Sequence, residues 1–336
     1  MKIGKVPENV LKRSVFKQIK LKRDEVLIHP GVGEDCSALQ LAPDEVFVLS
    51  TDPITGAASE IGTLAVHVTA NDLASAGAEP VGMLLSILLP QDAEEADLKS
   101  LMGEIESACE PLNIEIIGGH TEVTPVVNQP VVTVTGVGKA KKDAVIFTKG
   151  AQPGQDIVVT KWIGLEGTAI IASDREAELK SHYSREFVDR AKGFIQYLSV
   201  VKEAMLARDF GVAAMHDITE GGVFGALWEM AAAGNVGLTV DLKKVPLKQE
   251  TVEICEYFDL NPYQLISSGS MLIACDRGYD LVEHLKKAGI HSAVIGKFTD
   301  NNDKIIVYDE GETRYLEPPK TDELYKLHLS APMRSI

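Results

Sequence analysis

The chain has 336 residues, 45% of them hydrophobic and 24% charged, a balance typical of globular rather than disordered proteins. This length favours two domains over one. A formal net charge of -16 disfavours nucleic acid and anionic membrane surfaces as partners, and a phosphate-bearing substrate would need a metal cation beside it. The cysteines are scattered, and no stretch resembles a signal peptide or a membrane span, so we expect a cytoplasmic protein.

The chain begins with a basic segment. Residues 12–23 (KRSVFKQIKLKR) predict a solvated amphipathic helix within an N-terminal extension that we place at residues 1–28. A turn-rich stretch ending at Asp35 leads into the strand CSALQL, and a second turn leads into the apolar strand VFVLSTD, which we expect to end at Asp52. The two strands are expected to pair like a hairpin, with Asp35 and Asp52 beside them.

The stretch IGTLAVHVTANDLASAGAEP (61–80) predicts an amphipathic helix, because its apolar residues recur at helical spacing. Gly77 suits the left-handed end of that helix, and Val81–Leu89 predicts a buried strand. Asn71 and Asp72 form a polar pair inside the helix. For Asp72 alone, a capping or side-chain hydrogen bond is the simpler interpretation, since a lone desolvated carboxylate is destabilising.

Alternating strands and helices follow. Residues 92–112 predict a helix with a capping box between Asp92 and Glu95, and the strand IEII leads into a turn at Gly118–Glu122. The segment VVTVTGVG predicts a further strand. We therefore expect a mixed α/β first domain at residues 29–145.

A charged, turn-rich segment at residues 140–155 marks the boundary to a second domain, expected at residues 150–330. Its most polar turn is HDITEGG (216–222), which precedes a helix whose expected N-cap is Thr219. The segments 161–168 and 183–192 are candidates for lining a substrate, although surface loop and surface helix are equally good interpretations.

The familiar nucleotide motifs are missing. GVGED does not continue as a dinucleotide fingerprint, because Cys36 stands where the third glycine is required, and GVGKA (136–140) lacks the first glycine and the final Ser or Thr of a P-loop. Asp35, Asp52 and Asp72 favour another interpretation. Mg²⁺ prefers oxygen ligands, and strand ends with an adjoining helix can bring carboxylates into one cleft, where the metal would offset their repulsion and a phosphate charge.

Taken in order, the motifs resemble those of the AIR synthase-related (PurM-like) ATP-binding superfamily. The resemblance spans about residues 31–296 and is carried by GVGEDCSAL, STDP, NDLASAGAEP, GGHTEV, HDITEGGVFGALWEM and LISSGSMLIA. NDLASAGAEP and TEGGVFGALWEM are most similar to hydrogenase-maturation proteins of the HypE type. The resemblance implies a two-domain α/β fold whose N-terminal sheets pair across a homodimer into a barrel, with a C-terminal α/β domain.

Transferred residue by residue, the resemblance implies a site for ATP with magnesium. The metal ligands would be Asp35, Asp52 and Asp72, with Asn71 as a supporting polar group. Phosphate contacts in the first domain would come from Gly118, Gly119, His120 and Thr121. The wall from the second domain would be Asp217, Thr219, Gly221 and Gly222, where a helix N-terminus can hold an anion. For Asp217, a plain helix-start role is an equally good interpretation.

Three positions depart from the family pattern. His120 stands where the family commonly has an acidic metal ligand, so it would bind a metal weakly or bond to phosphate, with Glu122 as a substitute carboxylate or a surface residue. Glu220 stands where the HypE type usually has arginine. The sequence ends at Ile336, whereas HypE proteins end in a cysteine that carries the carbamoyl group, so we expect that chemistry not to proceed as in HypE.

Three functions are consistent with this reading. The first is an ATP- and magnesium-dependent enzyme that transfers a phosphoryl group to an oxygen of a small or peptide-borne acceptor, with no catalytic side chain assigned. The second is a non-catalytic, nucleotide-binding maturation or regulatory partner. The third is a kinase similar to thiamine-monophosphate kinase.

Overall fold

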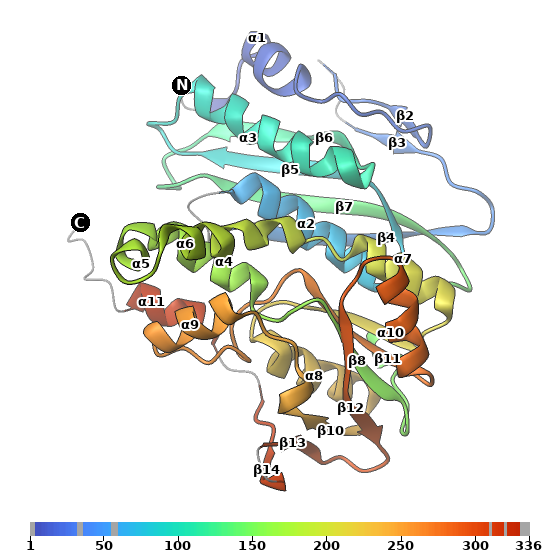
Figure 1. The fold of residues 1–336 in the computed structure, drawn as a ribbon. Coiled ribbons are helices and arrows are strands. Elements are labelled where there is room, and N and C mark those ends of the chain that lie inside the picture. The colour runs from blue at the N-terminus through green and yellow to red at the C-terminus, as the bar shows by residue number, and fades with distance from the viewer. Residues whose placement is uncertain (1–3, 32–35, 55–59, 309–310, 319–320, 330–336) are drawn as a thin grey trace. The chain divides into compact units, whose positions relative to one another are not determined.

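The computed structural model describes residues 4–31, 36–54, 60–308, 311–318 and 321–329, and the chain divides into two compact units (Figure 1). Unit 1 comprises Met1–Ala74 and Ala78–Val145, and unit 2 comprises Ser75–Gly77 and Ile146–Ile336. Both units mix helices and strands, so the expected α/β class is confirmed. Among the described residues, no helix is long and apolar enough to cross a membrane.

Unit 1 consists of strands and a smaller number of helices. Its strands are β1 (Gly4–Lys5), β2 (Val26–Ile28), β3 (Ala38–Leu39), β4 (Glu45–Ile54), β5 (Glu79–Leu89), β6 (Glu115–Val123) and β7 (Val131–Lys141). Its helical elements are α1 (Glu8–Val10), the π-helix η1 (Leu11–Phe16), α2 (Ile61–Ser75), α3 (Glu95–Cys109) and the 3₁₀ turn η2 (Glu110–Leu112).

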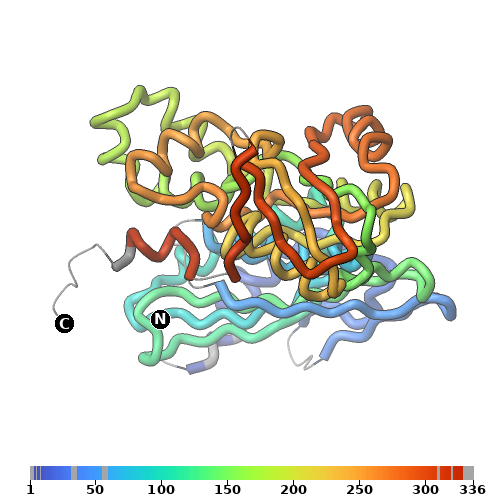
Figure 2. The backbone as a smooth tube through the Cα atoms, turned by 90° about the horizontal axis from the view of Figure 1, so that it is seen from below, coloured from blue at the N-terminus to red at the C-terminus, as the bar shows by residue number. Residues whose placement is uncertain are grey.

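The main sheet of unit 1 has the strand order β1-β6-β5-β7-β4 among the described residues, and its long strands run side by side in Figures 1 and 2. Helix α2 packs directly on β7, because Gly136 has no side chain and a Cβ there would lie 2.6 Å from Thr69 of α2. Gly62 allows α2 to approach α3 in the same way, since a Cβ would lie 2.9 Å from Ile105. We call the side of the sheet that faces α2 the helix face.

Strand pairing differs from the sequence prediction. Strand β3, which carries the CSALQL segment, pairs with β2 in a separate two-stranded sheet, while β4 pairs with β7, so the predicted hairpin of β3 and β4 is wrong. Strand β4 also continues to Ile54, which places Asp52 inside the strand and not at its end. Local turn signals located the strands, but the partner of each strand depends on residues far away in the chain.

Two further expectations for unit 1 are corrected. The capping box of α3 joins Glu94 and Asp97, two residues beyond the predicted pair of Asp92 and Glu95; the Glu94 N–H donates to the Asp97 carboxylate at 2.8 Å. The predicted turn at Gly118–Glu122 lies within β6. By contrast, the predicted left-handed end of α2 is confirmed, because Gly77 has φ +75°.

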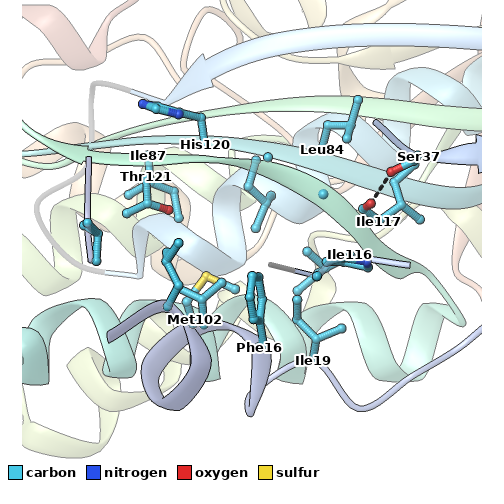
Figure 3. Close-up of a pocket in the computed structure, with 18 of the residues that line it drawn as sticks. Phe16, Ile19, Ser37, Leu84, Ile87, Met102, Ile116, Ile117, His120 and Thr121 are labelled. Atoms are coloured by element: carbon cyan, nitrogen blue, oxygen red, sulfur yellow. Dashed lines mark hydrogen bonds between the residues drawn. The ribbon is translucent and has the colours of Figure 1, made fainter. Parts of the chain in front are cut away.

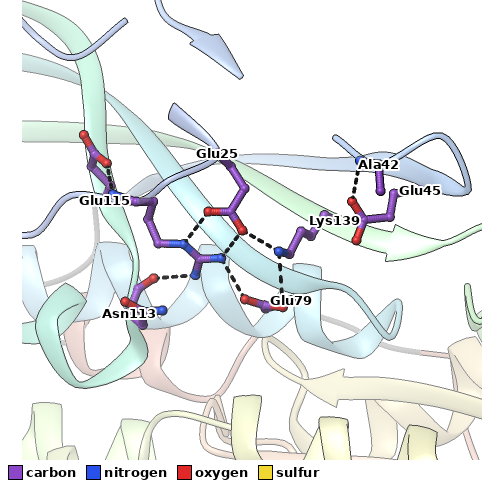
Figure 4. Close-up of polar contacts among 8 residues, drawn as sticks. Glu25, Ala42, Glu45, Glu79, Asn113, Glu115 and Lys139 are labelled. Carbon is purple, nitrogen blue, oxygen red and sulfur yellow. Dashed lines mark hydrogen bonds and ion pairs between the residues drawn. The ribbon is translucent and has the colours of Figure 1, made fainter. Parts of the chain in front are cut away.

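An ionic network around the buried Arg23 side chain holds the segment before β2 against the sheet. Arg23 is only 7% exposed, and its guanidinium donates to Glu25, to Glu79 at 2.8 Å and to the Asn113 carbonyl at 2.8 Å. Lys139 of β7 also contacts Glu25 and Glu79 (Figure 4). The hydrogen bond from Arg23 is the main reason why the pKa of Glu25 lies well below its ordinary value. The expectation that residues 12–23 form one solvated helix is therefore wrong at its C-terminal end.

Unit 2 contains a second sheet and the helices that pack on it. Its strands are β8 (Asp156–Thr160), β9 (Ala214–Ile218), β10 (Gly237–Asp241), β11 (Ser270–Cys275), β12 (Ser292–Thr299), β13 (Lys304–Val307) and β14 (Thr313–Tyr315). Its α-helices are α4 (Leu165–Asp174), α5 (Glu176–His182), α6 (Arg185–Lys192), α7 (Val201–Phe210), α8 (Gly222–Gly234), α9 (Gln249–Tyr257), α10 (Gly278–Lys287) and α11 (Leu324–Leu329). Short 3₁₀ turns are η3 (Thr148–Gly150), η4 (Gly193–Tyr197) and η5 (Leu242–Lys244).

The sheet of unit 2 has the order β14-β13-β10-β12-β8-β11-β9 among the described residues. Helix α8 buries Val223, Leu227 and Met230 in the same core as apolar residues of β8, β10 and β11. The N-cap of α8 is Gly221, with φ +79°, and not Thr219, whose carbonyl instead accepts the Gly222 N–H at 3.1 Å. A glycine is needed at 222, because φ is +60° and a Cβ would lie 2.6 Å from the Tyr263 carbonyl oxygen.

The Arg23 network generates a prediction about stability. We expect Arg23→Met to lower the free energy of unfolding of unit 1 by about 3 kcal/mol, because it leaves Glu25 with Lys139 alone in a largely buried setting. Urea unfolding of the whole chain, followed by a probe in unit 1, measures this change.

The matched control is Arg13→Met. Arg13 also pairs with a glutamate, Glu95, but its side chain is 49% exposed, so a loss of less than about 1 kcal/mol is expected. Equal losses for the two variants would contradict the structural role given to the buried network.

Candidate functional site

Two of the predicted metal ligands lie together on the helix face of unit 1. Ser50 and Asp52 alternate along β4 with the exposed residues Leu49 and Thr51, so they point toward α2. The Ser50 hydroxyl lies 3.3 Å from the Asp52 carboxylate and also contacts the carboxylate of Asp72 on α2. The strand and the helix thus bring two carboxylates, 20 residues apart in sequence, to one hydroxyl.

The remaining predicted ligand and the polar residue beside the pair have different settings. Asp35 lies outside the described residues. Asn71 is fully buried on α2, whereas the neighbouring Asp72 is half-buried. Among the described residues, no group of three or more His, Cys, Asp or Glu side chains is placed to hold a metal ion. What is described is therefore a pair of carboxylates, with oxygen donors of the kind that Mg²⁺ prefers.

The glycines of β6 create an irregular strand segment. The pairing of β5 with β6 shifts register between Met83 and Leu84, opposite Ile116 and Gly118. Gly119 adopts φ +144°, and a Cβ there would lie 2.0 Å from the Leu85 carbonyl oxygen. Only glycine fits this close approach of two backbones, and the bulge changes which side chains face each side of the sheet.

A cavity of about 780 Å³ lies beside this segment, entirely within unit 1. Its walls are largely apolar and come from η1 and the residues after it, from α3, and from β5 and β6, with Gly118, Gly119, His120 and Thr121 also in the lining. Figure 3 shows Phe16, Ile19 and Met102 grouped on one side of this cavity and His120 on the other. Such a cavity, mostly apolar with a few polar groups, is typical of small-molecule sites.

The carboxylate pair and His120 are not brought together within one chain. The register places Asp52 opposite Val134, Val134 opposite Leu85, and Leu85 opposite Gly119. Two strands lie between β4 and β6, so the residues at the ends of this row are about 14 Å apart.

The direction of the His120 side chain separates it further. His120 follows Gly119 and pairs in register with the exposed Ser86, so it points to the opposite face of the sheet from Asp52. On that face its ring lies 3.1 Å from the Glu122 carboxylate. Thr121 is buried on the helix face. The β6 segment thus presents its polar groups on both sides of the sheet.

The predicted residues of unit 2 lie at the junction of β9 and α8. Asp217 is 4% exposed near the end of β9, one residue from His216, whose ring lies 2.9 Å from Glu229. Gly221 and Gly222 form the turn that starts α8. The Gly221 N–H, which we expected to face an anionic ligand, donates to the carboxylate of Asp322 at 2.7 Å.

Two protein-family models together match most of the chain. Residues 33–140 match the N-terminal domain of the AIR synthase related proteins, and residues 152–309 match the C-terminal domain. The chain belongs to the AIR synthase related protein family.

Two similar proteins carry names from hydrogenase maturation. A putative hydrogenase expression/formation protein of Methanocaldococcus jannaschii is 27% identical over 96% of this chain and 96% of its own length. The carbamoyl dehydratase HypE of Cupriavidus necator is 30% identical over 72% of this chain and 69% of its own length.

Solved structures show the same fold. HypE of E. coli superimposes with a TM-score of 0.80 at 21% identity, covering 95% of this chain and 99% of that one. A structure of HypE in complex with ATP gives a TM-score of 0.79 at 20% identity, covering 94% and 95% of the two chains. The HypE-like, PurM-like fold predicted from the motifs is therefore confirmed.

Sequence reasoning missed two residues at these places. Ser50 belongs to the quoted STDP motif and was not singled out, although a hydroxyl two residues before a carboxylate on one strand shares its face. Asp322 carries no local signal, because its partner Gly221 is 101 residues away.

The backbone of Gly119 generates a prediction. We expect Gly119→Ala to lower the free energy of unfolding by at least about 2 kcal/mol, because alanine is strained at this φ and its Cβ overlaps the Leu85 carbonyl. Denaturant unfolding measures the loss. Gly103→Ala on α3 is the matched control: nothing lies within 4 Å of its Cβ, and alanine favours the helix, so unchanged or higher stability is expected. A fully stable Gly119→Ala protein would refute the described β5–β6 approach.

Proposed function

We propose that this chain is an ATP- and magnesium-dependent enzyme that transfers the γ-phosphoryl group of ATP to the oxygen of a carbamoyl-type acceptor, and that this acceptor is carried by a separate molecule and not by a terminal cysteine of the chain itself. The observation that carries the proposal is the convergence of Asp52 and Asp72 on the Ser50 hydroxyl. It is supported by family membership, by similarity to a protein named carbamoyl dehydratase, and by the fold shared with a HypE solved with ATP.

The carboxylate pair is suited to a hard divalent cation. A serine hydroxyl has one proton, so Ser50 can donate to only one of its two carboxylate neighbours at a time. Two carboxylates held this close repel each other, and a cation between them relieves the repulsion. Magnesium bound by Asp52 and Asp72 would also neutralise phosphate charge during transfer. Ser50 keeps the two carboxylates oriented from the strand side.

The glycine-rich segment of β6 supports the phosphate side of the proposal. Gly118 and Gly119 line the cavity, and glycine is the residue that lets a polyphosphate approach the backbone closely. The family resemblance also implies a role in ligand binding for Asp217, Gly221 and Gly222 of unit 2, and this role stays a prediction. Phosphoryl transfer of this kind depends on positioning and charge neutralisation and needs no covalent nucleophile.

The proposed reaction balances without a redox partner. The oxygen of a carbamoyl group, R–C(=O)NH₂, attacks the γ-phosphorus, the bond to the β-phosphate oxygen breaks, and ADP leaves. Loss of the phosphorylated oxygen as phosphate, with removal of both N–H protons, then leaves the nitrile R–C≡N. The net change is dehydration of the acceptor coupled to conversion of ATP to ADP and phosphate.

A second copy of the chain is the proposed structural partner. The face of β4 that points away from α2 carries Phe47 and Leu49, which are 49% and 65% exposed. Large apolar side chains exposed side by side on an edge strand favour pairing with another sheet. This supports the homodimer that the family resemblance implies.

We expect Asp52→Asn and Asp72→Asn each to weaken magnesium-dependent ATP binding at least about tenfold, because one ligand charge is lost in each. Titration calorimetry with ATP, with and without Mg²⁺, measures the loss. Asp44→Asn is the matched control, since Asp44 is an exposed aspartate that pairs with Lys141 at 3.5 Å in the turn before β4. Wild-type affinity in both site variants would overturn the carboxylate–metal assignment.

A turnover assay separates enzyme from binding partner. ADP release is measured with ATP and Mg²⁺, alone and with a peptide bearing S-carbamoyl cysteine, and nitrile formation is followed by infrared absorption. Acceptor-dependent ADP and nitrile support the proposed reaction. ATP binding with no ADP under any condition would favour a non-catalytic partner, and phosphorylation of thiamine monophosphate would favour the kinase.

A further inference from the structure

The last described segment of unit 2, Asp322–Leu329, contacts the start of helix α8. We call it the C-terminal strap. The carboxylate of Asp322, 3% exposed, accepts the Gly221 N–H at 2.7 Å and the Leu324 N–H at 2.9 Å. Gly221 is the N-cap of α8, so a side chain of the chain itself occupies the positive end of a 13-residue helix.

Several further contacts fasten the strap. Glu323 is 5% exposed, accepts the Asn261 N–H at 2.9 Å and pairs with Lys326 at 2.7 Å. The Tyr325 hydroxyl donates to Glu220 at 2.8 Å, and Arg175 at the end of α4 donates to the Leu327 carbonyl at 3.2 Å. The strap is therefore held by side chains of α4, by the turn before α8 and by the segment after α9.

An acidic group, Glu166, lies next to the segment that Asp322 holds: the N–H of the adjacent Gly167 donates to the Ile266 carbonyl at 3.1 Å, and the Ile266 N–H is hydrogen-bonded to Asp322. Glu166 of α4 is 5% exposed, and its carboxylate accepts the Ser268 N–H at 3.1 Å. In the described part of the chain, three charged or titratable groups interact with Glu166. They are Asp322 and Tyr325 of the strap and Glu220 of the turn before α8. Asp322 and Glu220 are carboxylates, so an ionised Glu166 lies near groups of its own charge, whereas the Tyr325 phenol is neutral.

We propose that protonation of Glu166 controls the position of the C-terminal strap. When Glu166 is protonated, the Asp322 carboxylate accepts the Gly221 N–H; when Glu166 is ionised, its charge repels Asp322 and the strap is released. We call this device the latch. Gly221 and the C-terminal strap both belong to unit 2, and the latch goes beyond the proposed enzymatic function. It also makes two uses of the Gly221 N–H mutually exclusive, because an anionic ligand can reach that group only after Asp322 has left.

The direction of the pH effect follows from the surroundings of Glu166. Burial is the main cause that raises its pKa from 4.5 to about 7, with the charges of Asp322 and Glu220 adding to it. Burial also raises the pKa of Asp322. A raised pKa of an acid stabilises the folded arrangement at low pH, and this contribution is lost as pH rises through the folded value. The strap is therefore fastened near pH 6 and loosened near pH 8.

Hydrogen exchange of the whole chain tests the latch. Exchange is measured by mass spectrometry on peptides covering residues 322–329 between pH 6 and 8.5, after correction for intrinsic exchange rates. In the wild type we expect protection of these peptides to fall roughly tenfold across pH 7, the change equivalent to about one pKa unit of coupling. Glu166→Gln, a neutral mimic of the protonated acid, should keep the strap protected throughout.

Two more variants complete the test. Asp322→Ala should lower strap protection at pH 6 by roughly tenfold, since a charged acceptor of buried N–H groups is removed. Glu323→Gln is the matched control: it changes a buried acid of the strap that has its own partner Lys326, and should retain the wild-type pH dependence. A Glu166→Gln protein with the wild-type pH dependence would overturn the latch, and so would unchanged protection in Asp322→Ala. Neither result bears on ATP binding at Asp52 and Asp72.

Discussion

The alternation of side chains along β4 is the constraint on which the candidate site depends. Because successive residues of a strand point to opposite faces, Ser50 and Asp52 reach α2 together, whereas Leu49 and Thr51 cannot. A slip of one residue in the pairing of β4 with β7 would turn both polar residues to the other face. Gly136 of β7 lets α2 approach the sheet, and this close approach also allows Asp72 of α2 to reach Ser50 of β4.

The features that could be predicted from the sequence are those with a local signal. The bounds of α2, its end at Gly77 and the strand that follows were predictable, because apolar spacing and a left-handed glycine are local signals. The ordered motifs also indicated the family and its fold. Pairing was not predictable: β3 was expected to join β4, and Gly118–Glu122 was expected to be a turn, because strand partners are chosen by contacts between distant segments.

The candidate site was predictable to a similar extent. The motif residues Asp52 and Asp72 both lie beside the Ser50 hydroxyl, whereas Asp35 lies outside the described residues, and the role of the three aspartates as metal ligands stays a prediction. The hydroxyl shared by Asp52 and Asp72 and the opposite orientation of His120 depend on register, which the motifs do not encode. The contact of Asp322 with Gly221 joins positions 101 residues apart, and no spacing rule connects two such positions. Contacts between residues that are distant in the chain could not be predicted from the sequence.

The residues just before β2 have a consequence for how the chain can be shortened. Glu115 of β6 has no exposed surface; its carboxylate accepts the Arg23 N–H at 2.5 Å and contacts the His29 ring. A chain that lacks residues 1–28 would retain Glu115 and Glu79 but lose Arg23, which donates hydrogen bonds to both. The predicted extension is thus packed into the first unit, whose buried polar contacts begin before the matched family region at residue 33.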